Sequence, residues 1–172
     1  GIYGCPDSDG DGYANTDDDL PNDPNEWRDS DNDGYGNNQD DCDNSYGTSD
    51  MNGIYGCPDS DGDGYANTDD AFPNDSSEWD DSDSDGVGDN SDNCNSEDAT
   101  GYDNNNDGCI DDSDGDGYKD NVDQCVNEDS RGYDQNQDGC IDDSDGDGLK
   151  DNVDQCVNED SRGYDQNQDG CI

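Results

Sequence analysis

Apolar residues are too sparse along this chain, and too irregularly spaced, to predict helices or strands. They occur singly or in short groups such as "NVDQCV" (residues 121–126), which is long enough for only one helical turn or a short strand. Gly, Asn and Asp stand between them every few residues, and these residues favour turns. The pattern therefore predicts an irregular fold with little regular secondary structure.

Composition excludes an apolar core of ordinary size. The 172 residues include 52 acidic and 5 basic ones, which gives a formal net charge of −47. Chains of this kind stay disordered unless something other than apolar burial orders them. Calcium is one candidate, since carboxylates are its preferred ligands. Disulfides are the other, because the chain has nine cysteines and no histidine, as in disulfide-stapled extracellular proteins.

Two internal repeats organise the chain. "GIYGCPDSDGDGYANTDD" starts at Gly1 and again at Gly53, a period of 52 residues. A second unit starts at Asp107 and recurs from Asp138 with a period of 31 residues. Repeats of this kind contact mainly their neighbours along the chain. We predict four units, at residues 1–52, 53–104, 105–135 and 136–172. Because the last unit is incomplete, we expect the sequence to be a window of a longer, processed chain.

Six segments share the spacing D-x-D-x-D-G-x-x-[DN]-x-x-D, and we call them the main loops. Acids at the first, third and fifth places can point inward at one hard cation, while Gly at the sixth place permits the sharp turn. The seventh residue offers its carbonyl, and the twelfth acid closes the far side. Two carboxylates ~4 Å apart repel by about 4 kcal/mol at an effective dielectric of ~20, and a divalent cation between them reverses the sign. The main loops therefore predict at least six Ca²⁺ ions.

The predicted acidic ligands of the main loops occupy the first, third, fifth and twelfth places. They are Asp7, Asp9, Asp11 and Asp18; Asp29, Asp31, Asp33 and Asp40; Asp59, Asp61, Asp63 and Asp70; Asp81, Asp83, Asp85 and Asp92; Asp112, Asp114, Asp116 and Asp123; and Asp143, Asp145, Asp147 and Asp154. The predicted seventh-place carbonyls belong to Tyr13, Tyr35, Tyr65, Val87, Tyr118 and Leu149.

Two other interpretations of the main loops are weaker. A solvated acidic tail would show runs of acids without a fixed glycine. Paired EF-hands would need an amphipathic helix on each side and usually Glu at the twelfth place. Here the twelfth place is always Asp, and proline-containing flanks such as "YGCP" and "DLPNDP" oppose long helices.

A second series of segments, which we call the overlapping loops, repeats the start of this pattern. Each overlaps the start of the next main loop, so that one aspartate would be a ligand in both loops. The alternative is that these segments are ordinary turns of Asp, Asn and Gly. We favour metal binding because the spacing is kept while other residues change. The predicted ligands are Asp103, Asn105, Asp107, Cys109 (carbonyl), Asp111 and the shared Asp114; Asp134, Asn136, Asp138, Cys140 (carbonyl), Asp142 and the shared Asp145; and, in a truncated copy, Asp165, Asn167 and Asp169.

The cysteines recur with a gap of 15 residues from Cys42 onward. Sequence alone does not fix connectivity, but the repeat favours successive pairs, and each closed loop of ~15 residues then contributes about 3 kcal/mol in the chain-entropy model. The predicted pairs are Cys42–Cys57, Cys94–Cys109, Cys125–Cys140 and Cys156–Cys171. Cys5 is left over, and we expect its partner upstream of the window. Four main loops thus carry cysteine at the fourteenth place, whereas the loops that begin at Asp7 and Asp59 carry Leu20 and Phe72 there, each followed by proline.

The run D-x-D-x-D-G-x-x-D-x-x-D-x-C, at residues 112–125 and 143–156, resembles the thrombospondin type 3 repeat, and the resemblance covers essentially the whole chain. It implies an elongated, disulfide-stapled extracellular array wrapped around a row of Ca²⁺ ions. It also implies ninth-place ligands, direct or through water, at Asn15, Asn37, Asn67, Asp89, Asp120 and Asp151. The segments "DLPNDPNEW" and "AFPNDSSEW" lack the cysteine and are more similar to microbial surface-protein variants.

Aromatic residues are numerous for so polar a chain, with ten tyrosines and two tryptophans. They either pack locally over disulfides and neighbouring loops or protrude and pack between chains. Asn74, followed by Asp75 and Ser76, is the one N-glycosylation sequon and so a candidate modification site.

The function that these features predict is structural. No catalytic constellation is present, so we do not expect an enzyme, and the charge opposes nucleic acid. No apolar run approaches the ~20 residues that span a bilayer, so membrane insertion is not expected. One hypothesis is a calcium-stiffened extracellular spacer or adhesion segment. The other is a subunit of a self-assembling calcium-bound filament, whose partners are copies of itself or other matrix or surface components. Flanking adhesin or enzyme domains would favour the spacer, and a terminal donor element the filament.

Overall fold

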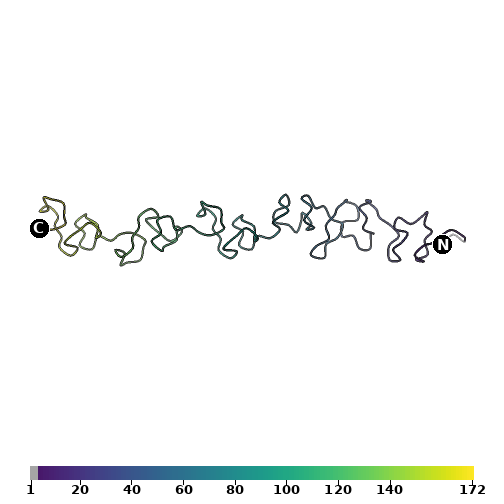
Figure 1. The fold of residues 1–172 in the computed structure, drawn as a ribbon, viewed down its shortest axis with the longest axis horizontal. Coiled ribbons are helices and arrows are strands. Elements are labelled where there is room, and N and C mark those ends of the chain that lie inside the picture. The colour runs from purple at the N-terminus through teal and green to yellow at the C-terminus, as the bar shows by residue number, and fades with distance from the viewer. Residues whose placement is uncertain (1–3) are drawn as a thin grey trace. The chain divides into compact units, whose positions relative to one another are not determined.

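The fold is irregular throughout the part of the chain that the structure describes. The computed structural model describes residues 4–172, and within that range it contains turns and bends but no helix and no strand (Figure 1). No helix in this range is long and apolar enough to cross a membrane. The prediction of little regular secondary structure is confirmed.

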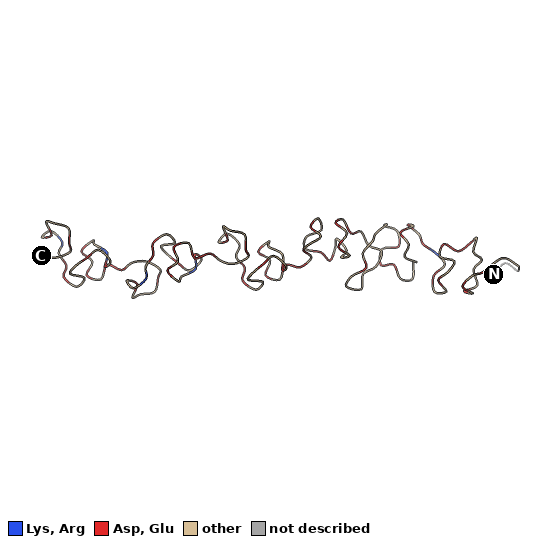
Figure 2. Cartoon of the chain, in the orientation of Figure 1, with Lys and Arg blue, Asp and Glu red and all other residues tan. Residues whose placement is uncertain are grey.

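Contacts along the chain group into two units, Gly1–Asn95 and Ser96–Ile172. Each unit is a succession of closed loops, and acidic residues are spread along the chain in both (Figure 2). The first unit contains the main loops that begin at Asp7, Asp29, Asp59 and Asp81. The second contains the remaining two main loops and the three overlapping loops.

A nine-residue ring is the structural element that both units repeat. In each main loop the ninth-place N–H donates to the carbonyl of the residue before the first place, as from Asn37 to Arg28 (2.8 Å) and from Asp120 to Asp111 (2.8 Å). The ring bends this tightly because its fourth and sixth residues both have positive φ, a conformation that glycine adopts without strain. The sequence predicted the sixth-place glycine. It did not single out the fourth place, where Asn32 (φ 66°) and Ser84 (φ 68°) adopt the same conformation.

Apolar burial is as limited as the composition predicted. The buried apolar residues in the described range are Ala14, Cys57, Ala66, Ala99, Ile110 and Ile141. Buried polar residues are more numerous and include aspartates of the loops, two glutamates and three serines. Side-chain and backbone hydrogen bonds therefore replace an ordinary core.

Disulfides close the chain at the predicted spacing. Cys42–Cys57, Cys125–Cys140 and Cys156–Cys171 are bonded, with Cα–Cα separations of 5.0, 5.1 and 5.3 Å. Cys94 and Cys109 are disulfide-bonded as well, so the chain has four disulfides. Cys5 is a free, exposed thiol. Four disulfides are typical of proteins from an oxidising environment.

Aromatic rings pack in local pairs in the first unit, and other rings are exposed. Tyr13 stacks on Trp27 with ring centroids 5.2 Å apart, and Tyr65 stacks on Trp79 at 5.3 Å. Tyr46 and Tyr164 are 62% and 72% exposed. Local packing of aromatic rings therefore occurs in the first unit, whereas packing of the exposed rings between chains stays a prediction.

Candidate metal sites

The first-place aspartate of each main loop holds the backbone of its ring. In the loop that begins at Asp112, Oδ1 accepts from the N–H of Gly115 (2.8 Å) and Oδ2 from the N–H of Gly117 (3.0 Å). The other five main loops repeat these two bonds from their fourth and sixth residues. This fixes the first carboxylate inside the ring.

The fifth aspartate of every main loop, and the third aspartate of all but the loop that begins at Asp29, accepts through Oδ1 from a backbone N–H of its own ring. Oδ2 of Asp33 and of Asp116 also accepts from a backbone N–H, that of Gly47 (3.1 Å) and of Ser130 (3.3 Å). Asp114 Oδ1 accepts from the N–H of Asp116 (3.1 Å), and Asp116 Oδ1 accepts from the N–H of Tyr118 (2.8 Å). In at least four main loops, oxygens of the first, third and fifth carboxylates lie within 4.8 Å of one another. Three negative side chains are thus held close enough to bind one cation.

The second oxygens of these aspartates are buried and unsatisfied in many loops. Oδ2 of Asp114 is buried within the described part of the chain and has no hydrogen-bond partner. A buried carboxylate oxygen without a partner is costly unless a cation or donor meets it. The same holds, at the third, fifth or twelfth place, for Oδ2 of Asp9, Asp11, Asp31, Asp40, Asp61, Asp63, Asp92, Asp123, Asp145 and Asp154.

In three main loops, burial and the acids of the ring raise the pKa of the twelfth-place aspartate. Burial raises the pKa of Asp123, the N–H of Cys125 opposes this, and the nearby Asp114 and Asp116 raise it further. Burial also raises the pKa of Asp40 and Asp70, with the acids of their own rings as further causes. Proximity to the ring acids is what the twelfth-place prediction requires.

A short helical turn carries the twelfth aspartate in the four loops with cysteine at the fourteenth place. There the twelfth-place N–H donates to the eighth-place carbonyl, as from Asp40 to Gly36 (2.9 Å) and from Asp123 to Lys119 (3.0 Å). The carboxylate then accepts from the cysteine N–H, as from Cys125 to Asp123 (2.6 Å). The disulfide therefore begins two residues after the closing acid.

The ninth-place side chain is engaged with the second residue of the ring. Asn15 Oδ1 accepts from the N–H of Ser8 (2.8 Å), and its Nδ2 donates to the Ser8 hydroxyl (2.7 Å). Asp120 accepts from both the N–H (2.8 Å) and the hydroxyl (2.6 Å) of Ser113. The structure thus gives the ninth place a role in closing the ring, and its contact with an ion stays a prediction.

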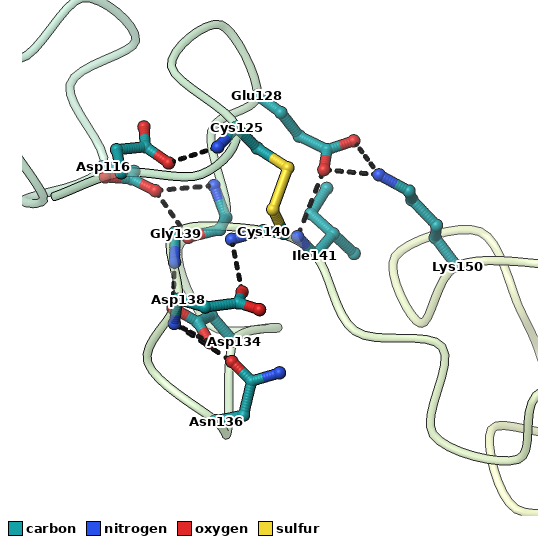
Figure 3. Close-up of a disulfide and its surroundings, with 12 residues drawn as sticks. Asp116, Cys125, Glu128, Asp134, Asn136, Asp138, Gly139, Cys140, Ile141 and Lys150 are labelled. Carbon is teal, nitrogen blue, oxygen red and sulfur yellow. Dashed lines mark hydrogen bonds and ion pairs between the residues drawn. A yellow bond between two sulfur atoms is a disulfide. The ribbon is translucent and has the colours of Figure 1, made fainter. Parts of the chain in front are cut away.

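Two of the overlapping loops, which begin at Asp103 and Asp134, form the same ring as the main loops. The N–H of Asp111 donates to the Tyr102 carbonyl and that of Asp142 to the Tyr133 carbonyl, each at 2.9 Å. Asp134 Oδ2 accepts from the N–H of Gly139 (3.1 Å). Figure 3 shows Asp134, Asn136 and Asp138 beside the Cys125–Cys140 disulfide. The segments that begin at Asp103 and Asp134 therefore have the ring geometry of the main loops rather than that of isolated turns.

Backbone donors favour ionised first-place acids in the overlapping loops. Burial opposes ionisation of Asp134, but the N–H groups of Gly139, Gln137 and Asp138 outweigh it and hold its pKa below the ordinary aspartate value. Asp103 and Asp165 have lowered pKa values for the same reason. These three carboxylates are thus poised to remain charged.

One further cluster of possible metal ligands does not form a metal site. Cys125, Glu128 and Cys140 lie close together, but the two sulfurs are joined in a disulfide and cannot act as thiolate ligands.

The candidate glycosylation site Asn74 is exposed, in a turn where its N–H donates to the Phe72 carbonyl (2.6 Å). Its modification stays a prediction.

Calcium and protons are expected to compete at the twelfth place. Without calcium, the carboxyl groups of Asp40, Asp70 and Asp123 should titrate above the ordinary aspartate pKa. A raised pKa in the folded chain stabilises the fold at low pH, and that contribution is lost as the pH rises through the folded pKa. Added calcium should reverse this and lower the three pKa values. Carboxyl ¹³C NMR over pH 2–7, with and without calcium, measures the shift, and unchanged values on calcium addition would contradict twelfth-place coordination.

In comparisons with known proteins, no family model matches this chain and no curated protein matches it. The resemblance to thrombospondin type 3 repeats therefore stays a prediction from the residues. The chemistry of the rings is defined by the structure alone, as acidic clusters that can hold metal ions.

Proposed function

We propose that this chain is a calcium-binding extracellular structural repeat that acts as a calcium-stiffened spacer or adhesion segment. One observation carries the proposal: inward-facing carboxylate oxygens are buried without partners at fixed places of successive rings. Calcium suits these rings because it accepts six to eight oxygen ligands in flexible geometry. Zinc prefers nitrogen and sulfur ligands, whereas every cysteine outside the exposed Cys5 is in a disulfide and the chain lacks histidine.

Stiffening follows from the electrostatics. At a formal charge of −47, the ion-free chain repels itself along its length. Each calcium ion draws three or more carboxylates of one loop together and fixes about twelve residues in one path. The four disulfides limit how far the chain can expand when the ions leave. A chain with few apolar contacts is thereby made rigid by ions that an extracellular fluid supplies.

The test is a calcium titration from ~10 μM to 10 mM, the range in which extracellular modules bind. Circular dichroism and small-angle X-ray scattering should both report ordering, and a chelator should reverse it. Magnesium at equal ionic strength is the control, because it keeps its water and fits a flexible ring poorly. Identical spectra and scattering with and without calcium would refute the proposal.

A filament subunit is the second candidate, and the exposed aromatic residues favour it. Tyr46 and Tyr164 lie largely in solvent, and exposed aromatic side chains are typical of interfaces. In this case the calcium-bound array itself is the polymer. Electron microscopy of the calcium-bound protein separates the two, since a spacer remains single and a filament subunit forms long ordered assemblies.

A further inference from the structure

The glutamates of this chain have a use different from that of the aspartates. The chain contains five glutamates, Glu26, Glu78, Glu97, Glu128 and Glu159, and none lies in a ring. Each stands in a segment that precedes a loop. Glutamate has a longer side chain than aspartate and can reach a neighbouring segment, and the structure shows four of the five doing so.

Glu26 and Glu78 hold the following loop through a backbone N–H. Glu26 Oε2 accepts from the N–H of Asn38 (3.1 Å), the tenth place of the loop that begins at Asp29. Glu78 Oε2 accepts from the N–H of Asn90 (3.0 Å), the tenth place of the loop that begins at Asp81. Both glutamates are buried, at 4% and 5% exposure. Each carboxylate caps the helical turn that carries the twelfth acid.

The eighth residue of these two loops is glycine because the glutamate occupies the space. A Cβ on Gly36 would lie 2.2 Å from Glu26 Oε2, and a Cβ on Gly88 would lie 2.2 Å from Glu78 Oε2. The other main loops have Ala or Lys at this place. A buried glutamate and the eighth-place glycine therefore form a matched pair.

Glu97 and Glu128 hold the following main loop through a lysine at its eighth place. Lys119 Nζ lies 2.5 Å from Glu97, and Lys150 pairs with Glu128 in the same way. Glu128 Oε2 also accepts from the N–H of Ile141 (3.2 Å). In Figure 3, Glu128 lies between Ile141 and Lys150, beside the Cys125–Cys140 disulfide. It thus joins the exit of one main loop to the turn of the next.

We infer that these four glutamates are positioning residues that set the calcium affinity of the next main loop after each of them. Every loop they hold has a helical turn in which the twelfth-place N–H bonds the eighth-place carbonyl. By fixing this turn before an ion arrives, the glutamate reduces the ordering cost of bringing in the closing ligand. The inference rests on the proposed calcium function and adds a coupling between each loop and the segment before it.

The experiment is a calcium titration of the 172-residue chain followed by ¹H–¹⁵N NMR. The Gly34 N–H, which donates to Asp29 Oδ2 (3.0 Å), reports the loop that Glu26 holds. The Gly64 N–H, which donates to Asp59 Oδ2 (3.0 Å), reports a loop with alanine at its eighth place. Glu26→Ala should raise the half-saturating calcium concentration at Gly34 by about tenfold, because the Asn38 N–H loses its buried acceptor. The midpoint at Gly64 should not move.

Two further variants separate positioning from general destabilisation. Glu26→Gln keeps an acceptor for the Asn38 N–H, so it should retain most of the affinity at Gly34. Glu159→Ala removes an exposed glutamate whose side chain has no hydrogen bond or ion pair to a loop within residues 4–172, and it should change neither midpoint. An unchanged Gly34 midpoint in Glu26→Ala, or equal shifts at Gly34 and Gly64, would overturn the inference alone. If calcium does not shift the Gly34 and Gly64 amide signals of the wild-type chain, the proposed function is overturned as well.

Discussion

Replacing Asp114 with alanine is expected to remove two calcium ions from each chain, whereas Asp61→Ala should remove one. Both aspartates occupy the third place of a main loop, both use Oδ1 to accept the fifth-place N–H (3.1 and 3.3 Å), and both have a buried Oδ2 without a partner. They differ in what precedes them. Asp114 is also the twelfth residue of the overlapping loop that begins at Asp103, whereas no overlapping loop precedes Asp61.

The expected loss is two ions because the Asp114 carboxylate is predicted to be a ligand in two loops. A carboxylate between two cations neutralises part of both charges, so its removal exposes the remaining acids of two rings to mutual repulsion. Loss of the third-place ligand leaves the main ring with two of its three clustered carboxylates, and the overlapping ring loses its closing acid. Calcium bound per chain, measured by equilibrium dialysis or native mass spectrometry at saturating calcium, counts the ions directly. Equal losses in the two variants would show that Asp114 serves one ion only.

Recurrent spacing is the reason that the rings could be predicted from the sequence. Positions within a ring lie close because only a few residues separate them and the sixth-place glycine permits the turn, so the acids at alternate places could be recognised from their spacing. In the same way, the gap of 15 residues between cysteines predicted the disulfides Cys42–Cys57, Cys125–Cys140 and Cys156–Cys171. The fourth-place conformation was missed because glycine, asparagine and serine all occupy that place. The shared feature is a preference for turns rather than one residue type.

Contacts between segments could not be predicted in this way. Glu128 and Lys150 are 22 residues apart, and Glu26 and Asn38 are 12 apart. Whether such residues meet depends on the path of the chain between them, which spacing does not define. One signal was available: the chain uses aspartate almost everywhere, so the few glutamates mark places where a longer reach is needed. The ninth place was assigned to the ion by resemblance, and only the structure shows its bonds to the second residue.

Substituting Gly139 with alanine is expected to displace the closing ligand of the main loop that begins at Asp112. A Cβ on Gly139 would lie 2.0 Å from Asp123 Oδ1 and 3.2 Å from the Asp123 Cα. The contact includes backbone, so the clash is not relieved by a rotamer change alone. A Cβ on Gly56 would lie 2.2 Å from Oδ1 of the twelfth acid Asp40, and a Cβ on Gly170 would lie 1.8 Å from Oδ1 of the twelfth acid Asp154. The disulfides Cys42–Cys57, Cys125–Cys140 and Cys156–Cys171 thus each hold a glycine of the next segment against the twelfth acid.

The matched control is Gly132→Ala, because Gly132 has a similar backbone conformation (φ +87° against +82°) but nothing within 4 Å of an added Cβ. Both variants carry the strain of a left-handed alanine, about 1 kcal/mol, so their difference isolates the clash. Gly139→Ala should be less stable than Gly132→Ala by a further 1–3 kcal/mol, roughly the cost of overpacking, in urea unfolding with calcium. It should also bind calcium more weakly at the loop that begins at Asp112, as read from the Gly117 amide. If the two variants unfold alike and the Gly117 midpoint is unchanged, Asp123 does not need this close packing to coordinate the ion.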